Sequence, residues 1–445
     1  MKEIINRMNP KFLIGSVLFF LMFFGEIAMT FSFKRDSNRN MQASELMPFT
    51  YNLNNDLSTN DLTNSIDSII GSFVQSYGIK GASVAIAHKG ELVYAKGFGY
   101  ADEEVDQYVE PKSLFRIASV SKLITGVAIM KLQEEGRINL SDKVFSRDGL
   151  LNDSVFLNYA DKRVEEITVM NLLDHTGGWE SKKGDPIFNS LYIARKLGIE
   201  PPASLDDIIR YQLTNKLDYR PGTTYSYSNF GYAILGRIIE KITGMNYEDY
   251  VQFAILHPLG IYDMHIGKSY YDDKYPNEVK YYDLEDVSSC YAYDGSGELV
   301  PLPYGGNNIE LLGAAGGWIA SAPELLKLVV SIDGMAGKVD ILSDESIEMM
   351  TRNSKRSKHL LGWRGTDGHG TWWRTGTLSG TTALVMRLKN EIDWVVLLNT
   401  TTKNRPRIHN EISKTMFKVL YSVKQWPEYD LFTYISTEKN SQPIQ

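Results

Sequence analysis

Ser119 and Lys122 stand three residues apart, a spacing that suits nucleophilic catalysis when both lie on one helix. The residues that follow, 120–132, are apolar on nearly every face and predict a helix that is buried all round. Residues i and i+3 share a helix face, so Ser119 Oγ and Lys122 Nζ could meet. Burial and the positive helix N-terminus both disfavour a charged lysine. A neutral Lys122 could therefore accept the Ser119 proton.

The same Ser-x-x-Lys spacing recurs at 436–439, in a polar C-terminal tail. The two copies differ in context, because only Ser119 opens an apolar helix. Burying a lysine there is unfavourable unless its amine has a role. A functional Lys122 is therefore the working hypothesis, and a purely structural one is the alternative.

A second candidate element is Tyr227-Ser228-Asn229. A tyrosine beside a cationic lysine can be held as a phenolate or a strong hydrogen-bond acceptor, which suits proton transfer to a leaving group. Asn229 returns to the same side of an extended loop, where its amide could orient Lys122 or the substrate. Tyr-x-Asn also occurs at 275–277, but that copy lies in a polar loop and is discounted.

A third element, with one cation, two hydroxyls and a glycine, ends a predicted strand over 371–374. It comprises Arg374, Thr375, Gly376 and Thr377, and we expect all four to bind substrate. The glycine lets a substrate backbone approach closely. A guanidinium suits bidentate binding of a carboxylate, so we expect Arg374 to favour substrates that carry one. The alternative is that Arg374 stacks on a neighbouring tryptophan and only supports the strand.

These three elements, in this order, resemble the Ser-x-x-Lys, Tyr-x-Asn and Lys-Thr-Gly motifs of the serine β-lactamase/penicillin-binding-protein superfamily. The surroundings are similar to its class C β-lactamase-like branch over roughly 61–421, in segments 115–122, 172–178, 221–236, 257–260 and 314–318. Arg374 stands where that family has Lys or often His.

The resemblance also implies a role for each site residue. It makes Ser119 the acylated nucleophile and Lys122 and Tyr227 the general base and acid, with Asn229 supporting them. It further implies that the backbone amides of Ser119 and Thr377 form an oxyanion hole.

The elements that must position these residues follow from periodicity. Residues 61–77 predict a helix, and 82–87 with 91–98 predict a hairpin. Residues 137 to about 310 alternate helical patterns with loops, before strands at 371–374, 381–388 and 394–399 and a helix over 407–421. This order predicts an α+β fold, an antiparallel sheet flanked by helices with an inserted, mostly helical domain. The resemblance makes it β-lactamase/transpeptidase-like.

The chain ends are polar except for one apolar segment. Basic residues precede the apolar run 12–24, which predicts a signal peptide. The run reaches the ~20 residues of a membrane-spanning helix only by continuing past Glu26. We therefore expect a signal peptide or membrane anchor at 1–33, a flexible linker at 34–60, the catalytic domain at 61–421 and a tail at 422–445. The protein is expected to be exported, either periplasmic or extracellular or anchored to the membrane.

Composition excludes several other classes of protein. The 445 residues carry a net charge of −7 without a concentrated basic stripe, so nucleic acid is not an expected partner. A single cysteine excludes an intrachain disulfide. Metal and cofactor motifs are absent from the sequence, so none is expected.

The sequence thus predicts an exported serine hydrolase that acts through an acyl-Ser119 intermediate. Its substrate would be an ester, a D-amino-acid peptide or a β-lactam. The alternative is a catalytically silent envelope binding or scaffold protein with the same fold.

Overall fold

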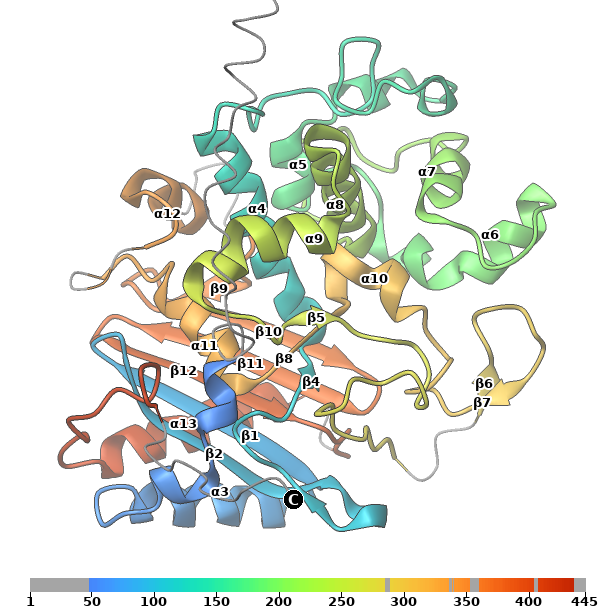
Figure 1. Cartoon of the computed structure of the whole chain (residues 1–445). Coiled ribbons are helices and arrows are strands. Elements are labelled where there is room, and N and C mark those ends of the chain that lie inside the picture. The colour runs from blue at the N-terminus through green and yellow to red at the C-terminus, as the bar shows by residue number, and fades with distance from the viewer. Residues whose placement is uncertain are drawn as a thin grey trace, which may run out of the picture. The chain divides into compact units, whose positions relative to one another are not determined.

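The N-terminal hairpin and the C-terminal strands join in one antiparallel sheet (Figure 1). The computed structural model describes residues 48–284, 289–335, 338, 340–352, 360–403 and 407–435. Over these residues the strand order is β3-β2-β1-β12-β11-β10-β9, and Val84 of β1 pairs with Val396 of β12. The strands are β1 (Gly81–His88), β2 (Glu91–Asp102), β3 (Gln107–Tyr108), β9 (Gly365–Thr366), β10 (Trp372–Leu378), β11 (Thr381–Leu388) and β12 (Ile392–Leu398).

Both faces of the central strands are covered by apolar packing. In β1, Val84 and Ile86 enter one hydrophobic cluster, whereas Ala85 and Ala87 enter the other, as the alternation of side chains along a strand requires. Helices α3 (Asn64–Ser76) and α13 (Ile408–Ser422) contribute to the first cluster. Helices α4 (Ser121–Glu134) and α11 (Ala322–Val330) contribute to the second. The sheet is therefore flanked by helices, as the sequence predicted.

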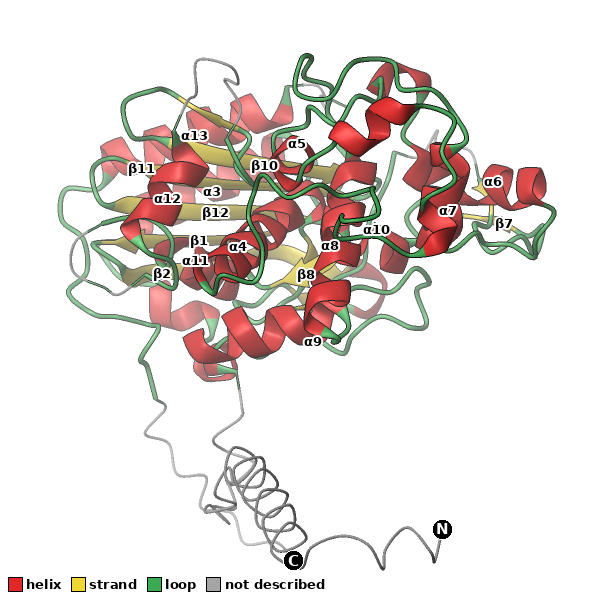
Figure 2. Cartoon of the chain, turned by 90° about the horizontal axis from the view of Figure 1, so that it is seen from above, coloured by secondary structure: helices red, strands yellow, loops and turns green. Residues whose placement is uncertain are grey.

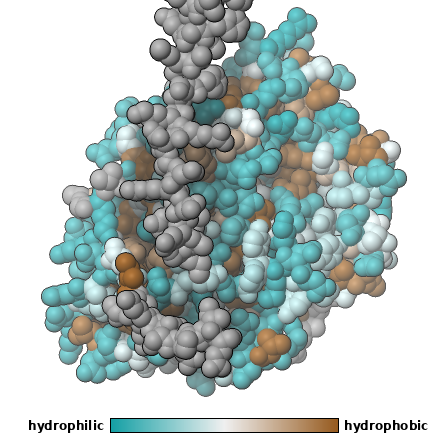
Figure 3. Space-filling view, viewed as in Figure 1, coloured by the Kyte–Doolittle hydropathy of each residue, from teal (hydrophilic) through white to brown (hydrophobic). Residues whose placement is uncertain are grey.

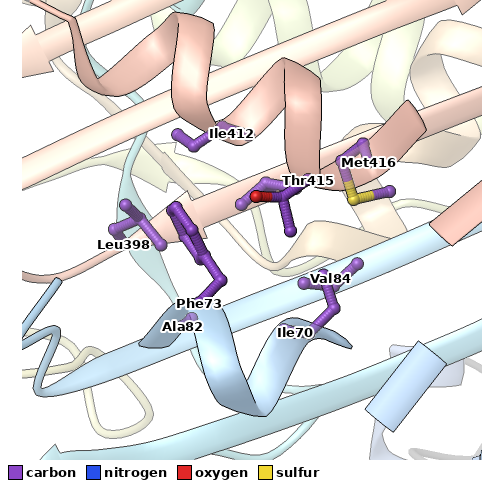
Figure 4. Close-up of a pocket in the computed structure, with 9 residues that line it drawn as sticks. Ile70, Phe73, Ala82, Val84, Leu398, Ile412, Thr415 and Met416 are labelled. Carbon is purple, nitrogen blue, oxygen red and sulfur yellow. The ribbon is translucent and has the colours of Figure 1, made fainter. Parts of the chain in front are cut away.

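A small void lies in the first cluster, between α3, α13 and the sheet (Figure 4). Its volume is about 10 Å³, and Phe73, Ile412 and Met416 are among the side chains that line it. An apolar space of this size cannot satisfy the hydrogen bonds of a water molecule. We interpret it as a packing gap and not as a binding site.

The helical insert occupies the upper part of the molecule in Figure 1. Two small sheets accompany it, β4 (Phe115–Arg116) with β8 (Trp318–Ala320) and β5 (His265–Ile266), and β6 (Cys290–Tyr291) with β7 (Leu299–Val300). Its helices are α5 (Val169–Leu173), α6 (Ser190–Leu197), α7 (Leu205–Leu213), α8 (Asn229–Thr243), α9 (Tyr247–Val251) and α10 (Ile309–Gly316); α12 (Asp344–Thr351) follows α11. The predicted α+β class with a mostly helical insert is confirmed.

Two segments assigned outside the catalytic domain are packed against it. Residues 48–60 contain 3-10 turns at Phe49–Asn52 and Asn55–Ser58, and the Ser58 hydroxyl donates to Ala95 O at 3.0 Å. Near the other end, Leu431 N donates to Leu92 O at 2.9 Å. The polar residues of 48–60 suggested a linker, but Asn54 caps a turn by accepting from two backbone amides. The packed fold therefore extends beyond 61–421 in both directions.

The predicted signal peptide or anchor, 1–33, lies outside the described residues. Within the described part of the chain, no helix is long and apolar enough to cross a membrane. The face drawn in Figure 3, where grey atoms do not cover it, is mostly hydrophilic with small groups of hydrophobic residues.

Candidate active site

Ser119 lies in a 3-10 turn, Ala118–Val120, that leads directly into α4. Ser119 is half-buried between buried neighbours, so the serine remains accessible from outside. The residue before it, Ala118, has a left-handed backbone with φ 47°. For a residue with a Cβ this conformation costs about 1–3 kcal/mol and persists only where the surroundings impose it. The turn thus holds Ser119 in a fixed, strained position above the buried helix.

Lys122 lies in the first turn of α4, one turn beyond Ser119, and is fully buried. Its Nζ lies 3.3 Å from Ser119 Oγ and donates to Asn229 Oδ1 at 2.7 Å and to Ala315 O. Burial lowers the pKa of Lys122 to about 8, and the nearby charge of Arg374 lowers it further against the opposing effect of Tyr227. At this pKa roughly a tenth of Lys122 is neutral at pH 7, far more than for an ordinary lysine.

A kink in α10 supplies the carbonyl groups that hold α4. Gly313 has φ 22° and ψ −105°, which breaks the helical geometry before Ala314 and Ala315. Thr125 Oγ1 donates to Ala314 O at 2.6 Å, and Lys122 donates to the next carbonyl. The sequence indicated this segment only through the family resemblance and gave no sign of its contact with Lys122.

Tyr227 lies on the other side of Ser119. Its hydroxyl donates to Ser119 Oγ at 2.8 Å and accepts from Arg374 Nη2 at 3.1 Å. Burial raises the pKa of Tyr227, but the positive charges of Lys122 and Arg374 outweigh this effect and lower it to about 8. The pKa values of Lys122 and Tyr227 thus approach each other from opposite directions around one serine hydroxyl.

His175 supports the loop that carries Tyr227. Its Nδ1 accepts from Ser228 N at 3.2 Å, and its ring centroid lies 4.5 Å from that of Tyr227. These contacts make His175 a positioning residue for Tyr227.

Asn229 and Asp185 connect Lys122 to the first turn of α8. Asp185 Oδ2 accepts from Asn229 N at 2.6 Å and from Phe230 N at 3.3 Å, while Asn229 Oδ1 accepts from Lys122. Burial raises the pKa of Asp185, whereas the backbone donors and the charge of Lys122 oppose the rise. The Gly184-Asp185-Pro186 sequence matches no catalytic motif, so Asp185 could not be found from the sequence.

Arg374 does not occupy the position expected of a carboxylate receptor. It is 1% exposed, and its Nε donates to Ser119 O at 2.7 Å while its Nη2 donates to Tyr227 OH. The enclosed guanidinium therefore serves Ser119 and Tyr227, and the geometry does not support the expected contact with a substrate carboxylate. The alternative of stacking on Trp372 or Trp373 is not observed among the described residues either. The cation over the Trp372 ring is Arg387, at 4.3 Å, and the ring beneath the Arg374 guanidinium is that of Tyr227, at 5.9 Å.

The side chains of β10 alternate between the two faces of the sheet. Arg374 and Gly376 face the Ser119 turn, so Thr375 and Thr377 project to the opposite face, where Thr377 Oγ1 lies 3.4 Å from His409 Nε2 of α13. The Thr377 hydroxyl therefore lies on the α13 side of the strand, and substrate binding by Thr375 and Thr377 stays a prediction.

The backbone of β10 does reach the site. Arg364, just before β9, donates its backbone N–H to Trp373 O of β10, and backbone groups alternate in direction along an antiparallel strand. The backbone groups of Thr375 and Thr377 thus point to the same edge of β10 as those of Trp373. Because β9 pairs only with Trp372 and Trp373, β9 does not cover this edge at the two threonines. A Cβ on Gly376 would lie 3.1 Å from Ser119 N and 2.2 Å from Ile117 O, so only glycine allows this approach. The Thr377 amide is consequently available at the edge beside the Ser119 turn.

Arg364 is a cation near the site that sequence reasoning missed. It is exposed, its Nη1 donates to Tyr225 OH at 2.5 Å, and its guanidinium carbon lies 5.5 Å from the Tyr227 ring centroid. It follows a Gly-Trp pair and belongs to no recognised motif.

Among the described residues, no group of three or more His, Cys, Asp or Glu side chains is arranged to hold a metal ion.

Comparison with known families agrees with this geometry. The model of the family described as Beta-lactamase matches residues 66–414. The chain belongs to the Beta-lactamase family. The protein flp of Staphylococcus aureus strain COL is 33% identical over 217 residues, which make up 49% of this chain and 41% of that protein. The chain thus spans less than half the length of this curated relative.

Solved structures show the same β-lactamase fold. The octameric penicillin-binding protein homologue from Pyrococcus abyssi superposes with a TM-score of 0.59 and 25% identity, over 81% of this chain and 78% of its own. D-amino acid amidase from Ochrobactrum anthropi SV3, complexed with L-phenylalanine amide, gives a TM-score of 0.63 and 21% identity, over 82% of this chain and 99% of its own.

Proposed function

We propose that this protein is an exported serine hydrolase that works through an acyl-Ser119 intermediate. One observation carries the proposal: Ser119 Oγ lies 2.8 Å from Tyr227 OH and 3.3 Å from Lys122 Nζ. Both proton-handling groups have pKa values of about 8, which suits proton transfer near neutral pH. A purely structural role would not require a buried lysine and a tyrosine to converge on one hydroxyl.

In the acylation step, Ser119 Oγ attacks the carbonyl carbon while its proton passes to the Lys122–Tyr227 pair. The negative charge on the carbonyl oxygen is stabilised by the amides of Ser119 and Thr377. Tyr227 then donates a proton to the leaving amine or alkoxide as the carbonyl–heteroatom bond breaks. In deacylation, water repeats the attack and gives its proton back through the same pair, which releases the acid and restores Ser119.

The substrate we propose is an ester, a D-amino-acid peptide or a β-lactam. The likeness to a D-amino acid amidase supports amide substrates of this kind. The exposed Arg364 beside Tyr225 and Tyr227 supports substrates with a carboxylate, because a guanidinium on the open side of the site can form charge-assisted hydrogen bonds. The basic and apolar N-terminal segment supports export.

A matched substrate panel tests the proposal. The purified protein is challenged with short acyl esters, D-alanyl-D-alanine peptides, their C-terminal amides and a labelled penicillin, beside Ser119→Ala. Turnover of at least one class by the wild type, lost in the variant, is expected. Arg364→Ala should lower kcat/KM for the free-carboxylate peptide more than for its amide, and Arg352→Ala, another exposed arginine, should change neither. Saturable binding without turnover of any substrate would instead favour the silent binding protein.

A further inference from the structure

A cavity of about 400 Å³ lies outside the Ser119 cluster, between α6, α7 and residues 179–189. Helices α6 and α7 lie side by side at one end of the molecule in both ribbon views (Figures 1 and 2). The volume falls within the range of roughly 300–1,000 Å³ that is typical of small-molecule sites. The proposed acyl-transfer chemistry uses none of the residues that line it.

Three aromatic rings line this cavity, those of Trp179, Tyr192 and Tyr211. Trp179 packs edge-on against Phe230, with 4.9 Å between the ring centroids. The ring centroids of Tyr192 and Tyr211 lie 6.4 Å apart, with an angle of 86° between the ring planes. Tyr192 is 52% exposed, so about half of its surface is open to solvent. The rings are thus held by their neighbours and still offer apolar surface to a ligand.

The polar groups of the cavity are mostly amides and balanced charges. Lys183 forms an ion pair with Asp218, and the Tyr219 hydroxyl donates to Glu180. The amide side chain of Gln212 has no hydrogen-bond partner among the residues that the structure describes, so its donors and acceptor are available. The remaining polar lining is Asn189, Asn215 and Lys216. The lining contains two acidic and two basic side chains, so their charges balance and the cavity favours neither an anionic nor a cationic ligand.

We propose that this cavity binds a neutral saccharide. A pyranose ring has an apolar C–H face, which fits against an aromatic ring, and a rim of hydroxyls that both donate and accept hydrogen bonds, as amides do. A peptide would instead be expected to pair its backbone with a strand edge. The elements around this cavity, over the described residues, are helices and loops. The lining therefore matches a sugar better than an extended peptide.

The saccharide site is linked to the Ser119 cluster through one loop. Ser181 N donates to Ser226 Oγ at 2.8 Å, and Asp185 accepts from Asn229 N. Both contacts join residues 179–189 to the segment that carries Tyr227. A sugar seated on Trp179 would therefore hold the loop that holds Asn229.

Binding of three neutral trisaccharides, N,N′,N″-triacetylchitotriose, maltotriose and cellotriose, tests this site by calorimetry on the full-length protein. At least one should bind saturably to the wild type and equally to Ser119→Ala, which separates this site from the acyl-transfer proposal. Tyr192→Ala and Gln212→Ala should each weaken binding at least tenfold. Tyr421→Ala, which removes a 95% exposed tyrosine on α13, should leave it unchanged.

Two results would overturn the proposal. They are no saturable binding of any of the three sugars, whether or not a neutral tetrapeptide binds, and sugar binding that survives both cavity substitutions. Circular dichroism of each variant establishes that it is folded, so a loss of binding reports on the cavity.

Discussion

Arg374 bridges the nucleophile and its proton-handling partner: its Nε donates to Ser119 O at 2.7 Å, and its Nη2 donates to Tyr227 OH at 3.1 Å. Arg374, the cation of the third motif, therefore influences the site through its charge and through these two hydrogen bonds, without contacting Ser119 Oγ. Its charge lowers the pKa of both Lys122 and Tyr227. This contact also gives the account its first test.

Replacing Arg374 should change the pH profile and not the substrate preference. In Arg374→Ala the lost positive charge lets the pKa of both Lys122 and Tyr227 rise, so the acid limb of kcat/KM moves to higher pH. At pH 7 activity should fall at least about tenfold, the usual effect of losing a charged hydrogen bond. Arg374→Lys, which keeps the charge, should stay closer to the wild type. An acid limb of kcat/KM at the same pH in Arg374→Ala as in the wild type would contradict this role.

Replacing Asp185 should shift the same limb in the opposite direction. Asp185→Asn keeps an oxygen for the Asn229 amide but removes a negative charge that raises the pKa of Lys122. The pKa of Lys122 should then fall and the acid limb move to lower pH. Asp249→Asn, on the exposed surface of α9, serves as the control and should leave the profile unchanged. A limb displaced upward, as in Arg374→Ala, would refute the assignment.

The wild-type pH dependence follows from the Lys122–Tyr227 pair. Below the shared apparent pKa of about 8 the base is protonated, so kcat/KM should fall tenfold per pH unit and be about 100-fold lower at pH 6 than on the plateau. Lys122→Arg should lose about 10²–10⁴ of kcat, because arginine retains its proton. Lys131→Arg, on the same helix, is the control. Near-normal turnover by Lys122→Arg would exclude lysine as the base.

Gly376 should tolerate no side chain. An added Cβ would lie 2.2 Å from Ile117 O, a backbone atom, so Gly376→Ala must displace β10 from the Ser119 turn. We expect a lower melting temperature and a loss of kcat of about 10²-fold or more, as when an oxyanion-hole donor is lost. Gly71→Ala, in α3 with open space around it, should instead be neutral or slightly stabilising. Full activity in Gly376→Ala would show that this contact is dispensable.

The sequence predicted the elements that local patterns define. Apolar periodicity located α3, α4, α13 and strands β1, β2, β11 and β12, and the Ser-x-x-Lys spacing placed Lys122 Nζ beside Ser119 Oγ. The direction of a side chain on β10 depends on register and on what packs behind the strand, which no short pattern encodes. For that reason Arg374 was expected to face the substrate and instead lies buried behind Tyr227.

Contacts between distant segments were also beyond the sequence. Asp185 acts through the amide of Asn229, 44 positions away, and Arg364 reaches Tyr225 across 139 positions. The 3-10 turns over 48–60 were missed for a related reason, since their asparagine and serine side chains bond to the backbone of the fold instead of to water.

The central claim, that Ser119 is the nucleophile, is tested most directly by mapping a covalent adduct. The protein is treated with a fluorophosphonate, digested and analysed by mass spectrometry, beside Ser119→Ala and Ser436→Ala, the latter in the second Ser-x-x-Lys copy. The account predicts one modified peptide, containing Ser119, that disappears in Ser119→Ala and persists in Ser436→Ala. An adduct on any other residue, or undiminished labelling of Ser119→Ala, would contradict it.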